Sequence, residues 1–205
     1  DSDTLYGGAG IDSLIGGGMG YLVKKPANWY ASRAGRELAA LAIQRIAAND
    51  PRAAASELEK LEGRLQPSER DWAWSQVALQ GARRHYPEAV VWYARAEQAA
   101  LSDDGFQWKV RAALRAHDWS MVLATIMEMP LALAAQPEWV YWLGRAYKAG
   151  GLTSEADALF EKIAGQPSFY GNLADEELGR KVVVPPKAKP PTAEEQKAAR
   201  DNPGV

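Results

Sequence analysis

Glycine, aspartate and leucine recur at a nine-residue interval at the start of the chain. Asp3 and Asp12 are nine residues apart, as are Leu5 and Leu14, and residues 7–14 read G-G-x-G-x-D-x-L. Carboxylate and turn carbonyl oxygens suit calcium, a hard cation that prefers oxygen ligands. The spacing therefore predicts a glycine-rich β-roll-like segment over residues 1–20, with Asp3 and Asp12 as calcium ligands.

The same segment has a second interpretation, because it is short. A roll of stacked turns buries its core only when several turns stack, and residues 1–20 hold barely two. Gly18-Met19-Gly20 also breaks the spacing. Residues 1–20 resemble the calcium-binding nonapeptide repeats of RTX-type proteins, and the alternative is a remnant of such a repeat joined to a helical protein.

Other residue types exclude several kinds of chemistry. The chain has no cysteine, so disulfides, thiol catalysis and cysteine-based zinc sites are excluded. His85 and His117, the two histidines, fall near expected helix C-termini without a cluster of partners, which predicts a structural role. The net charge of −2 gives no broad basic field, so we expect no nucleic-acid partner. No apolar run reaches the length of a membrane span.

The acidic residues give no recognisable catalytic pair. Glu176 and Glu177 are adjacent, and adjacent residues on a helix do not share a face. A glycosidase needs two carboxyl groups placed across a sugar. We therefore predict surface solvation or local ion pairing for these two glutamates, and no catalytic residue in the chain.

One helical hairpin organises the prediction of the fold. Within residues 137–164, five side chains follow the tetratricopeptide spacing L-G-x2-Y and A-x3-F: Leu143, Gly144, Tyr147, Ala156 and Phe160. Small residues at such positions let two antiparallel helices approach closely. Gly150-Gly151 is expected to end the first helix, and Thr153 to cap the second.

Further helices are expected on both sides of this hairpin. The patterns predict them at about 35–48, 51–65, 68–85, 87–100, 102–117, 118–129, 131–135, 168–178 and 192–200. The residues expected to cap or start these helices are Asp50, Ser68, Ser102, Asp118 and Thr192. Leu38, Leu41, Ala42 and Ile46 are expected on the buried face of the first. Short loops imply antiparallel neighbours. The predicted fold is all-α, a TPR-like α-solenoid over residues 21–180, followed by a Pro/Lys-rich linker and the start of a further helix over residues 181–205.

The order of several small motifs resembles the superhelical region of soluble lytic murein transglycosylases, over about residues 21–205. The motifs are Trp72-Ala73-Trp74, Gly81-Ala82-Arg83-Arg84, the segment 111–119, Trp139-Val140-Tyr141-Trp142 and the segment 168–179. That family consists of periplasmic enzymes that cleave the MurNAc–GlcNAc bond of peptidoglycan with a catalytic glutamate followed by serine. The Glu-Ser pair and its companion Gly-Leu-Met-Gln are absent here, so no catalytic residue carries over.

The resemblance suggests ligands for the aromatic and basic residues. Seven tryptophans offer possible stacking platforms for sugar rings: Trp72, Trp74, Trp92, Trp108, Trp119, Trp139 and Trp142. Packing between helices is the favoured role for them. Arg83, Arg84, Arg111 and Arg115 have two interpretations as well, contacts to muropeptide carboxylates or an unpaired solvated role, and we favour the second.

Three functions follow from the sequence. The first is a non-catalytic scaffold segment of a periplasmic lytic transglycosylase, with the peptidoglycan glycan strand and the enzyme's own catalytic domain as partners. The second is a helical adaptor that binds a protein or peptide. The third is a calcium-dependent secreted module. The chain begins at Asp1 without a methionine or signal peptide, so we expect a fragment or processed product. Because the Glu-Ser motif is absent, we expect this chain to be inactive by itself.

Overall fold

The computed structural model describes residues 24–181, 187 and 189–202. The predicted calcium ligands Asp3 and Asp12, like the whole glycine-rich segment 1–20, lie outside the described residues. Within those ranges the chain is all-helical, with eleven α-helices, two short 3-10 helices and no strand. The prediction of an all-α protein is therefore confirmed.

The helices follow one another through short connections. In chain order they are η2 (Ala27–Ala31), α3 (Arg33–Asn49), α4 (Pro51–Leu61), η3 (Glu62–Arg64), α5 (Pro67–Arg83), α6 (Ala89–Ala94), α7 (Asp103–Arg115), α8 (Trp119–Glu128), α9 (Leu131–Ala134), α10 (Pro137–Ala149), α11 (Thr153–Glu161), α12 (Phe169–Glu177) and α13 (Ala193–Arg200).

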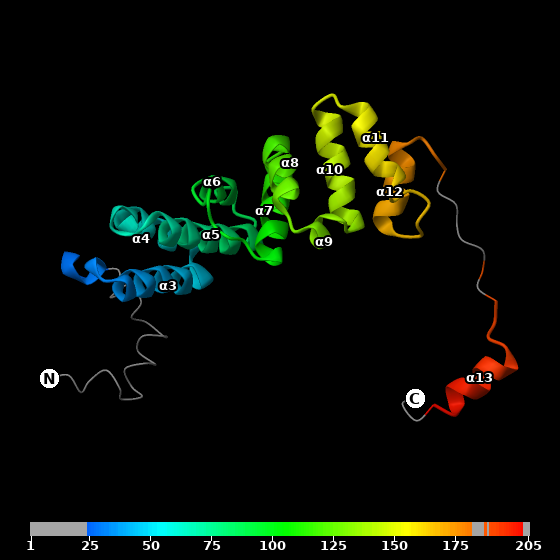
Figure 1. Cartoon of the computed structure of the whole chain (residues 1–205), viewed down its shortest axis with the longest axis horizontal. Coiled ribbons are helices and arrows are strands. Elements are labelled where there is room, and N and C mark those ends of the chain that lie inside the picture. Colours follow the sequence, from blue (N-terminus) through cyan, green and yellow to red (C-terminus); the bar gives the residue numbers. More distant parts are fainter. Residues whose placement is uncertain (1–23, 182–186, 188, 203–205) are drawn as a thin grey trace.

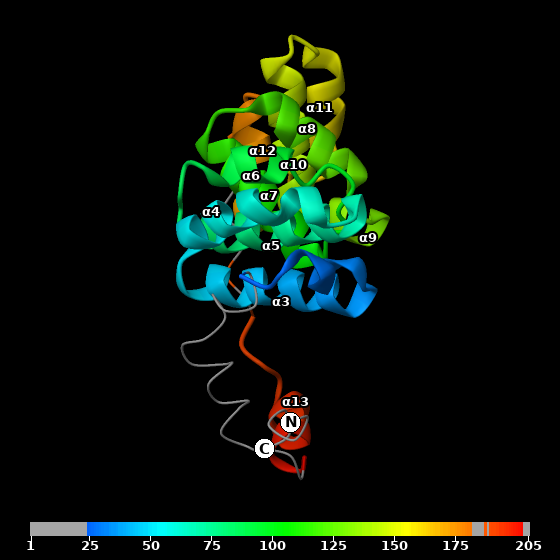
Figure 2. The same cartoon turned by 90° about the vertical axis from the view of Figure 1, so that its left-hand side faces the viewer.

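Helices α3 to α12 form one elongated array (Figure 1). In this view α3, α4 and α5 run across the picture, whereas α8, α10 and α11 run from top to bottom. Helix α13 lies apart from the array in both Figure 1 and Figure 2, and none of its residues is buried. The packed part of the protein therefore ends with α12.

Three hydrophobic cores lie along the array rather than one at its centre. The first extends from Tyr30 to Ala112, the second from Val110 to Ala146, and the third from Val140 to Ala174. Partly buried side chains join them, because Val90 packs on the first and second cores and Trp142 on the second and third. Each core is covered by neighbouring helices in the chain.

Helix starts match the predicted capping residues in several places. Asp50, Ser102, Asp118 and Thr192 each accept hydrogen bonds from backbone N–H groups at the starts of α4, α7, α8 and α13. Helix α4 ends earlier than predicted, and a 3-10 turn follows it. Helix α6 is also shorter than the predicted 87–100.

Two predicted caps are wrong. Helix α5 begins at Pro67 rather than after Ser68, because Gln66 and Glu69 form a reciprocal capping box in front of it. Helix α11 includes Thr153 as its first residue, and the preceding Leu152 provides no side-chain cap. Ser68 lies two positions after the observed N-cap and Thr153 one position after it. A capping-type residue this close to the helix start gives a similar local pattern, so the sequence did not separate the two.

The buried face of α3 also differs from the prediction. Leu38 and Leu41 are exposed, whereas Ala39, Ala42 and Ile43 are fully buried. Alanine on the buried face lets α3 lie close to its neighbours α4 and α5, which it contacts along its length. The larger leucines were wrongly assigned to the core because hydrophobicity alone favoured them.

Candidate functional site

Three of the five transglycosylase-like motif segments meet around one helix, whereas the motifs 72–74 and 81–84 lie at α5 in the first core. Helix α10, which contains the motif 139–142, contacts α8, α9, α11 and α12. Residues 111–119 end α7 and start α8, and residues 168–179 form α12 and its flanks. The predicted hairpin is present as α10 and α11, and a Cβ on Gly144 would lie 2.5 Å from the Phe160 ring. Close approach at Gly144 is therefore confirmed.

A charged cluster, formed by Tyr141, Arg145, Lys148 and Glu177, fixes α12 against α10. Arg145 Nη1 donates to the Tyr141 hydroxyl at 3.0 Å, and that hydroxyl donates to Glu177 Oε1 at 3.3 Å. Lys148 Nζ donates to Glu177 Oε2 at 2.8 Å, and Arg145 lies 3.1 Å from Glu177 Oε1. The predicted ion pairing of Glu177 is confirmed, but its partners are 29 to 36 residues away. Glu176 is exposed.

Charge stabilisation in this cluster favours the ionised carboxylate. Burial by itself would raise the pKa of Glu177, but the Lys148 hydrogen bond and the charges of Arg145 and Lys148 lower that pKa overall. Burial raises the pKa of Tyr141. Glu177 therefore stays negative near neutral pH and is unsuited to donate a proton to a glycosidic oxygen, which needs a carboxyl with a raised pKa.

Arginine side chains cover several aromatic rings of the array. Arg145 lies over Trp119 and Tyr141, and Arg111 lies over Trp108 and Trp139, with guanidinium-to-ring distances of 5.3 to 6.0 Å. All eight tryptophans are buried or half-buried. The predicted packing role of the tryptophans is therefore confirmed.

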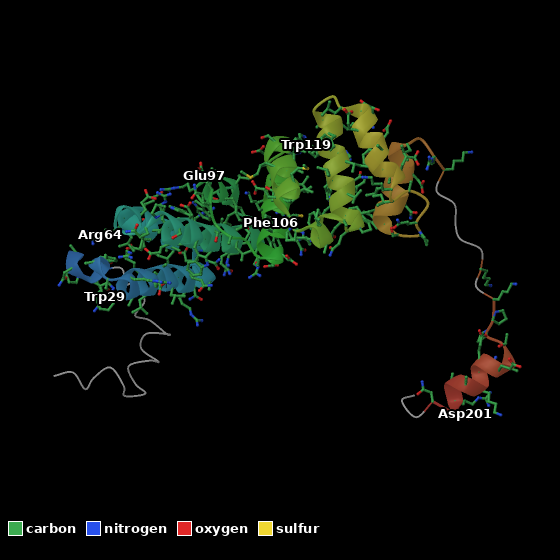
Figure 3. All side chains as sticks on the ribbon, viewed as in Figure 1. Trp29, Arg64, Glu97, Phe106, Trp119 and Asp201 are labelled. Atoms are coloured by element: carbon green, nitrogen blue, oxygen red, sulfur yellow. The ribbon has the colours of Figure 1, made fainter. Side chains whose placement is uncertain are left out.

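A second candidate region, the α4–α6 hollow, lies at the other end of the array. It is an open hollow of about 550 Å³ lined by Glu62, Gly63, Arg70, Asp71, Trp74, Ala94, Arg95 and Glu97. Figure 3 labels Glu97 and Trp119, and both lie along the upper edge of the array in that view. Sequence reasoning missed this hollow, since its residues come from three separate helices and their flanks.

The floor of the α4–α6 hollow is held by a network of charges. The Arg95 guanidinium lies 3.7 Å from the centre of the Trp74 ring, and Trp74 Nε1 donates to Glu62 Oε2 at 3.2 Å. Arg95 also donates to Glu62 at 2.7 Å and to Glu59 at 2.9 Å. Trp74 is fully buried beneath these groups. The hollow therefore has charged walls and no exposed aromatic surface.

A buried carboxylate completes this network. Asp71 is 2% exposed, and its Oδ1 accepts a hydrogen bond from Arg70 Nε at 2.8 Å. Its Oδ2 accepts the backbone N–H of Gln98 at 3.3 Å, which ties the segment after α6 to α5. Glu97, beside Gln98, is exposed and has no hydrogen bond or ion pair among the described residues.

The remaining predicted residues have structural positions. His85 and His117 adopt positive φ angles of 61° and 56° directly after α5 and α7, where Gly151 and Gly179 stand after α10 and α12. Their structural role is confirmed. Arg83 pairs with Asp104, Arg84 donates to the Ala48 carbonyl, and Arg111 contacts Gln107, so the expectation of unpaired arginines is wrong for these three. Arg115 is exposed.

Metal binding and membrane insertion each require a recognisable group of residues in the described part of the chain. No group of three or more histidine or acidic residues among them is placed to hold a metal ion. Among the same residues, no helix has the length and apolar character needed to cross a bilayer.

Comparison with known proteins identifies the helical array. Lytic transglycosylase Slt from Pseudomonas aeruginosa, solved as an inactive mutant, matches 79% of this chain with 27% sequence identity and a TM-score of 0.62. The chain resembles the soluble lytic transglycosylases. A 70-kDa soluble lytic transglycosylase, solved in complex with bulgecin A, matches 90% of the chain with 20% identity and a TM-score of 0.62. No family model and no curated protein matches.

The chain corresponds to a part of each of these two proteins. This chain spans 26% and 30% of the lengths of these two structures. At 27% identity, the first match supports a transglycosylase-related helical segment, and the second shows the fold. The family resemblance found in the sequence is confirmed.

Proposed function

We propose that this chain is a non-catalytic scaffold segment of a periplasmic lytic transglycosylase that cleaves the MurNAc–GlcNAc bonds of peptidoglycan. The observation that carries the proposal is the similarity of this chain to the lytic transglycosylase Slt of Pseudomonas aeruginosa, at 27% identity over 79% of the chain. In this proposal the helical array supports and positions a separate catalytic domain. That domain carries the catalytic glutamate and performs the transglycosylase reaction.

The chemistry of the described carboxylates supports a non-catalytic role. A transglycosylase needs an acid that protonates the glycosidic oxygen, in a cleft that stabilises positive charge on the sugar. Glu177 is the carboxylate of the Tyr141–Arg145–Lys148–Glu177 cluster that fixes α12 on α10, and two cations keep it ionised. In the α4–α6 hollow, Glu62 and Asp71 are each paired with an arginine.

The α10–α12 cluster has a natural place in this proposal. It joins α12, the last packed helix, to α10, and α12 is followed by the proline-rich segment. In a scaffold, such a contact sets the direction in which the chain leaves the array. The Tyr141–Arg145–Lys148–Glu177 network would therefore orient the part of the enzyme that follows α12.

Purified sacculi provide the test of the scaffold function. We expect the isolated chain to co-sediment with sacculi and to release no anhydro-muropeptides, measured by mass spectrometry of the supernatant. Release of anhydro-muropeptides would contradict the non-catalytic role, and loss of the activity on replacing one glutamate would locate the site. A chain that stays in the supernatant would contradict the link to peptidoglycan.

A TPR-like protein-interaction module is the second candidate. Its support is the α10–α11 hairpin, whose Gly144–Phe160 contact has the spacing of tetratricopeptide hairpins. The helices of such arrays stack into solenoids with a groove for peptides. Absence of binding to sacculi together with capture of one defined protein partner, competed by a peptide from that partner, would favour this adaptor function.

Calcium binding at Asp3 and Asp12 is a separate proposal that rests on the nonapeptide spacing alone. Isothermal calorimetry with the full chain tests it, with Asp3→Asn/Asp12→Asn as the matched control. No heat of binding at millimolar calcium would contradict it.

A further inference from the structure

The α4–α6 hollow brings both signs of charge to one open surface. Its lining includes two guanidinium groups, of Arg70 and Arg95, and three carboxylates, of Glu62, Asp71 and Glu97. The question is which of these groups remain available to a ligand.

The protein itself uses some of them and leaves others available. Glu62 is occupied by Trp74 and Arg95, and Asp71 by Arg70 and the Gln98 backbone. A guanidinium has five N–H donors. Arg70 directs Nε and Nη2 to Asp71, and Arg95 directs one N–H from each terminal nitrogen to Glu59 and Glu62. Both arginines therefore keep donors for an anion.

A free negative group lies beside these donors. Glu97 is exposed, lines the hollow, and has no partner among the residues that the structure describes. A ligand that fits must then offer an anionic group to Arg70 or Arg95 and a cationic group to Glu97. A carboxylate binds a guanidinium with paired N–H donors, and an ammonium group suits a carboxylate.

Neutral sugars fit this hollow poorly. Sugar rings bind proteins on exposed aromatic faces, and Trp74 is fully buried with Arg95 over its ring. Nucleic acid fits poorly as well, since carboxylates outnumber guanidinium groups in the lining. The described residues hold no metal-binding group of acidic residues either.

We propose that the α4–α6 hollow binds a short amphoteric peptide, with Arg70 and Arg95 on its carboxylate and Glu97 on its amino group. The proposal deepens the scaffold function and rests on it for the source of the peptide, because the peptides of peptidoglycan carry free carboxylates and free amino groups. The array then contacts the peptide side chains of the polymer, while the glycan strand goes to the catalytic domain.

The test uses a defined probe with the full chain. The probe is the tripeptide L-alanyl-γ-D-glutamyl-meso-diaminopimelate, titrated by calorimetry and by NMR. A neutral form of the same tripeptide, with amidated carboxylates and acetylated amines, and chitotetraose serve as comparison ligands. We expect binding of the charged tripeptide alone, weakened by added salt because the contacts are ionic and exposed.

Two substitutions and their matched controls locate the binding. Glu97→Gln removes a charge without a protein partner, and we expect affinity to fall on the order of threefold, as for an exposed ion pair. Ala94→Phe fills the mouth of the hollow at an exposed position, and we expect roughly tenfold or greater loss by steric exclusion. Glu155→Gln and Ala158→Phe make the same changes at exposed positions of α11 and should leave binding unchanged.

The outcomes separate this proposal from the scaffold function. Equal binding of the neutral tripeptide or of chitotetraose, no binding at millimolar tripeptide, or full binding by a folded Ala94→Phe variant would each overturn it. Retention of the chain on sacculi in any of these cases would leave the scaffold function standing. Circular dichroism and thermal unfolding establish that each variant is folded.

Discussion

The two ends of the array are packed from different side chains. Twelve of the 21 buried residues in the first core, around α3 to α6, are alanines. The third core, around α10 to α12, has two alanines among six and is dominated by the rings of Tyr141 and Phe160 with Tyr170 beside them. The first end gains stability from close approach of helices, and the second from large interlocking rings.

Helix ends follow the same division. The left-handed position after α5 and α7 is held by histidine, and after α10 and α12 by glycine. The same two backbone hydrogen bonds close all four turns. After α5 they run from His85 N to the Ala82 carbonyl and from Tyr86 N to the Gly81 carbonyl. The same turn therefore contains a strained histidine after α5 and α7 and an unstrained glycine after α10 and α12.

The largest expected effect is loss of a ring from the third core. Phe160 is fully buried against Gly144 and Tyr141, so Phe160→Ala should destabilise the protein by about 3–5 kcal/mol. Phe169→Ala, at a side chain that is 70% exposed, is the matched control and should change stability by less than about 0.5 kcal/mol. Chemical denaturation measures both. Equal effects would refute the claim that the Phe160 ring stabilises the third core.

Overpacking should be destabilising at both ends. A Cβ on Gly144 would lie 2.5 Å from Phe160, and one on Gly81 would lie 2.5 Å from Trp92. We expect Gly144→Leu and Gly81→Leu to cost about 1–3 kcal/mol each. Gly63, where an added Cβ would meet no atom within 4 Å, is the control position for the same substitution. An unchanged melting temperature for Gly144→Leu would contradict the close α10–α11 contact.

A smaller effect, with a defined pH dependence, is expected at Glu177. The pKa of Glu177 is lower in the folded protein than in the unfolded chain, where it is about 4.3. The stabilisation is therefore fully present above about pH 4.3 and disappears as the pH falls through the pKa of the folded protein. Glu177→Gln should cost about 1–2 kcal/mol at pH 7, because hydrogen bonds to a charged group are lost, and little at pH 3.

A matched pair at the other end sharpens this result. The Arg52–Glu88 pair is more exposed, with side-chain exposures of 57% and 39%, against 17% for Glu177. Glu88→Gln should therefore cost no more than about 1 kcal/mol, and added salt should abolish the effect. Denaturation curves at pH 3 and pH 7 measure the loss of stability for both variants. A difference for Glu177→Gln that does not change with pH would show that its charge is not the stabilising feature.

The smallest expected effect has opposite signs at the two ends. His117→Gly removes a side chain from a left-handed backbone position and should stabilise the protein by about 0.5 kcal/mol. Gly151→Ala introduces a side chain at the corresponding position, where φ is 80°, and should destabilise it by about 1 kcal/mol. Thermal unfolding checks both signs, and stabilisation by Gly151→Ala would contradict the assigned turn.

Much of the helical layout could be predicted because it depends on local chemistry. Asp50 and Ser102 bond the backbone within three residues of themselves, so a cap is visible in the sequence. The Gly144–Phe160 contact follows a known hairpin spacing. The misassigned leucines of α3 show the limit, because an alanine-lined helix contact cannot be recognised by hydrophobicity.

The charged sites were less visible because their partners are distant. Tyr141, Arg145 and Lys148 are spaced i, i+4 and i+7 on α10, and this shared face was the signal that could have indicated a cluster. Their acceptor Glu177 lies on another helix, so the pairing depends on how α12 packs. The α4–α6 hollow depends on the packing of three helices, and no spacing within one of them indicates it.

Trp142 has a consequence for how the protein unfolds. This one half-buried side chain packs on both the second and the third core, and Val90 joins the first core to the second. In a linear arrangement, cooperativity is transmitted only between neighbours. The array is therefore expected to lose its structure in stages from its ends, with hydrogen exchange fastest in α12 and slower toward the middle. A helical array of this kind yields locally to a bending force while the remaining helices stay folded.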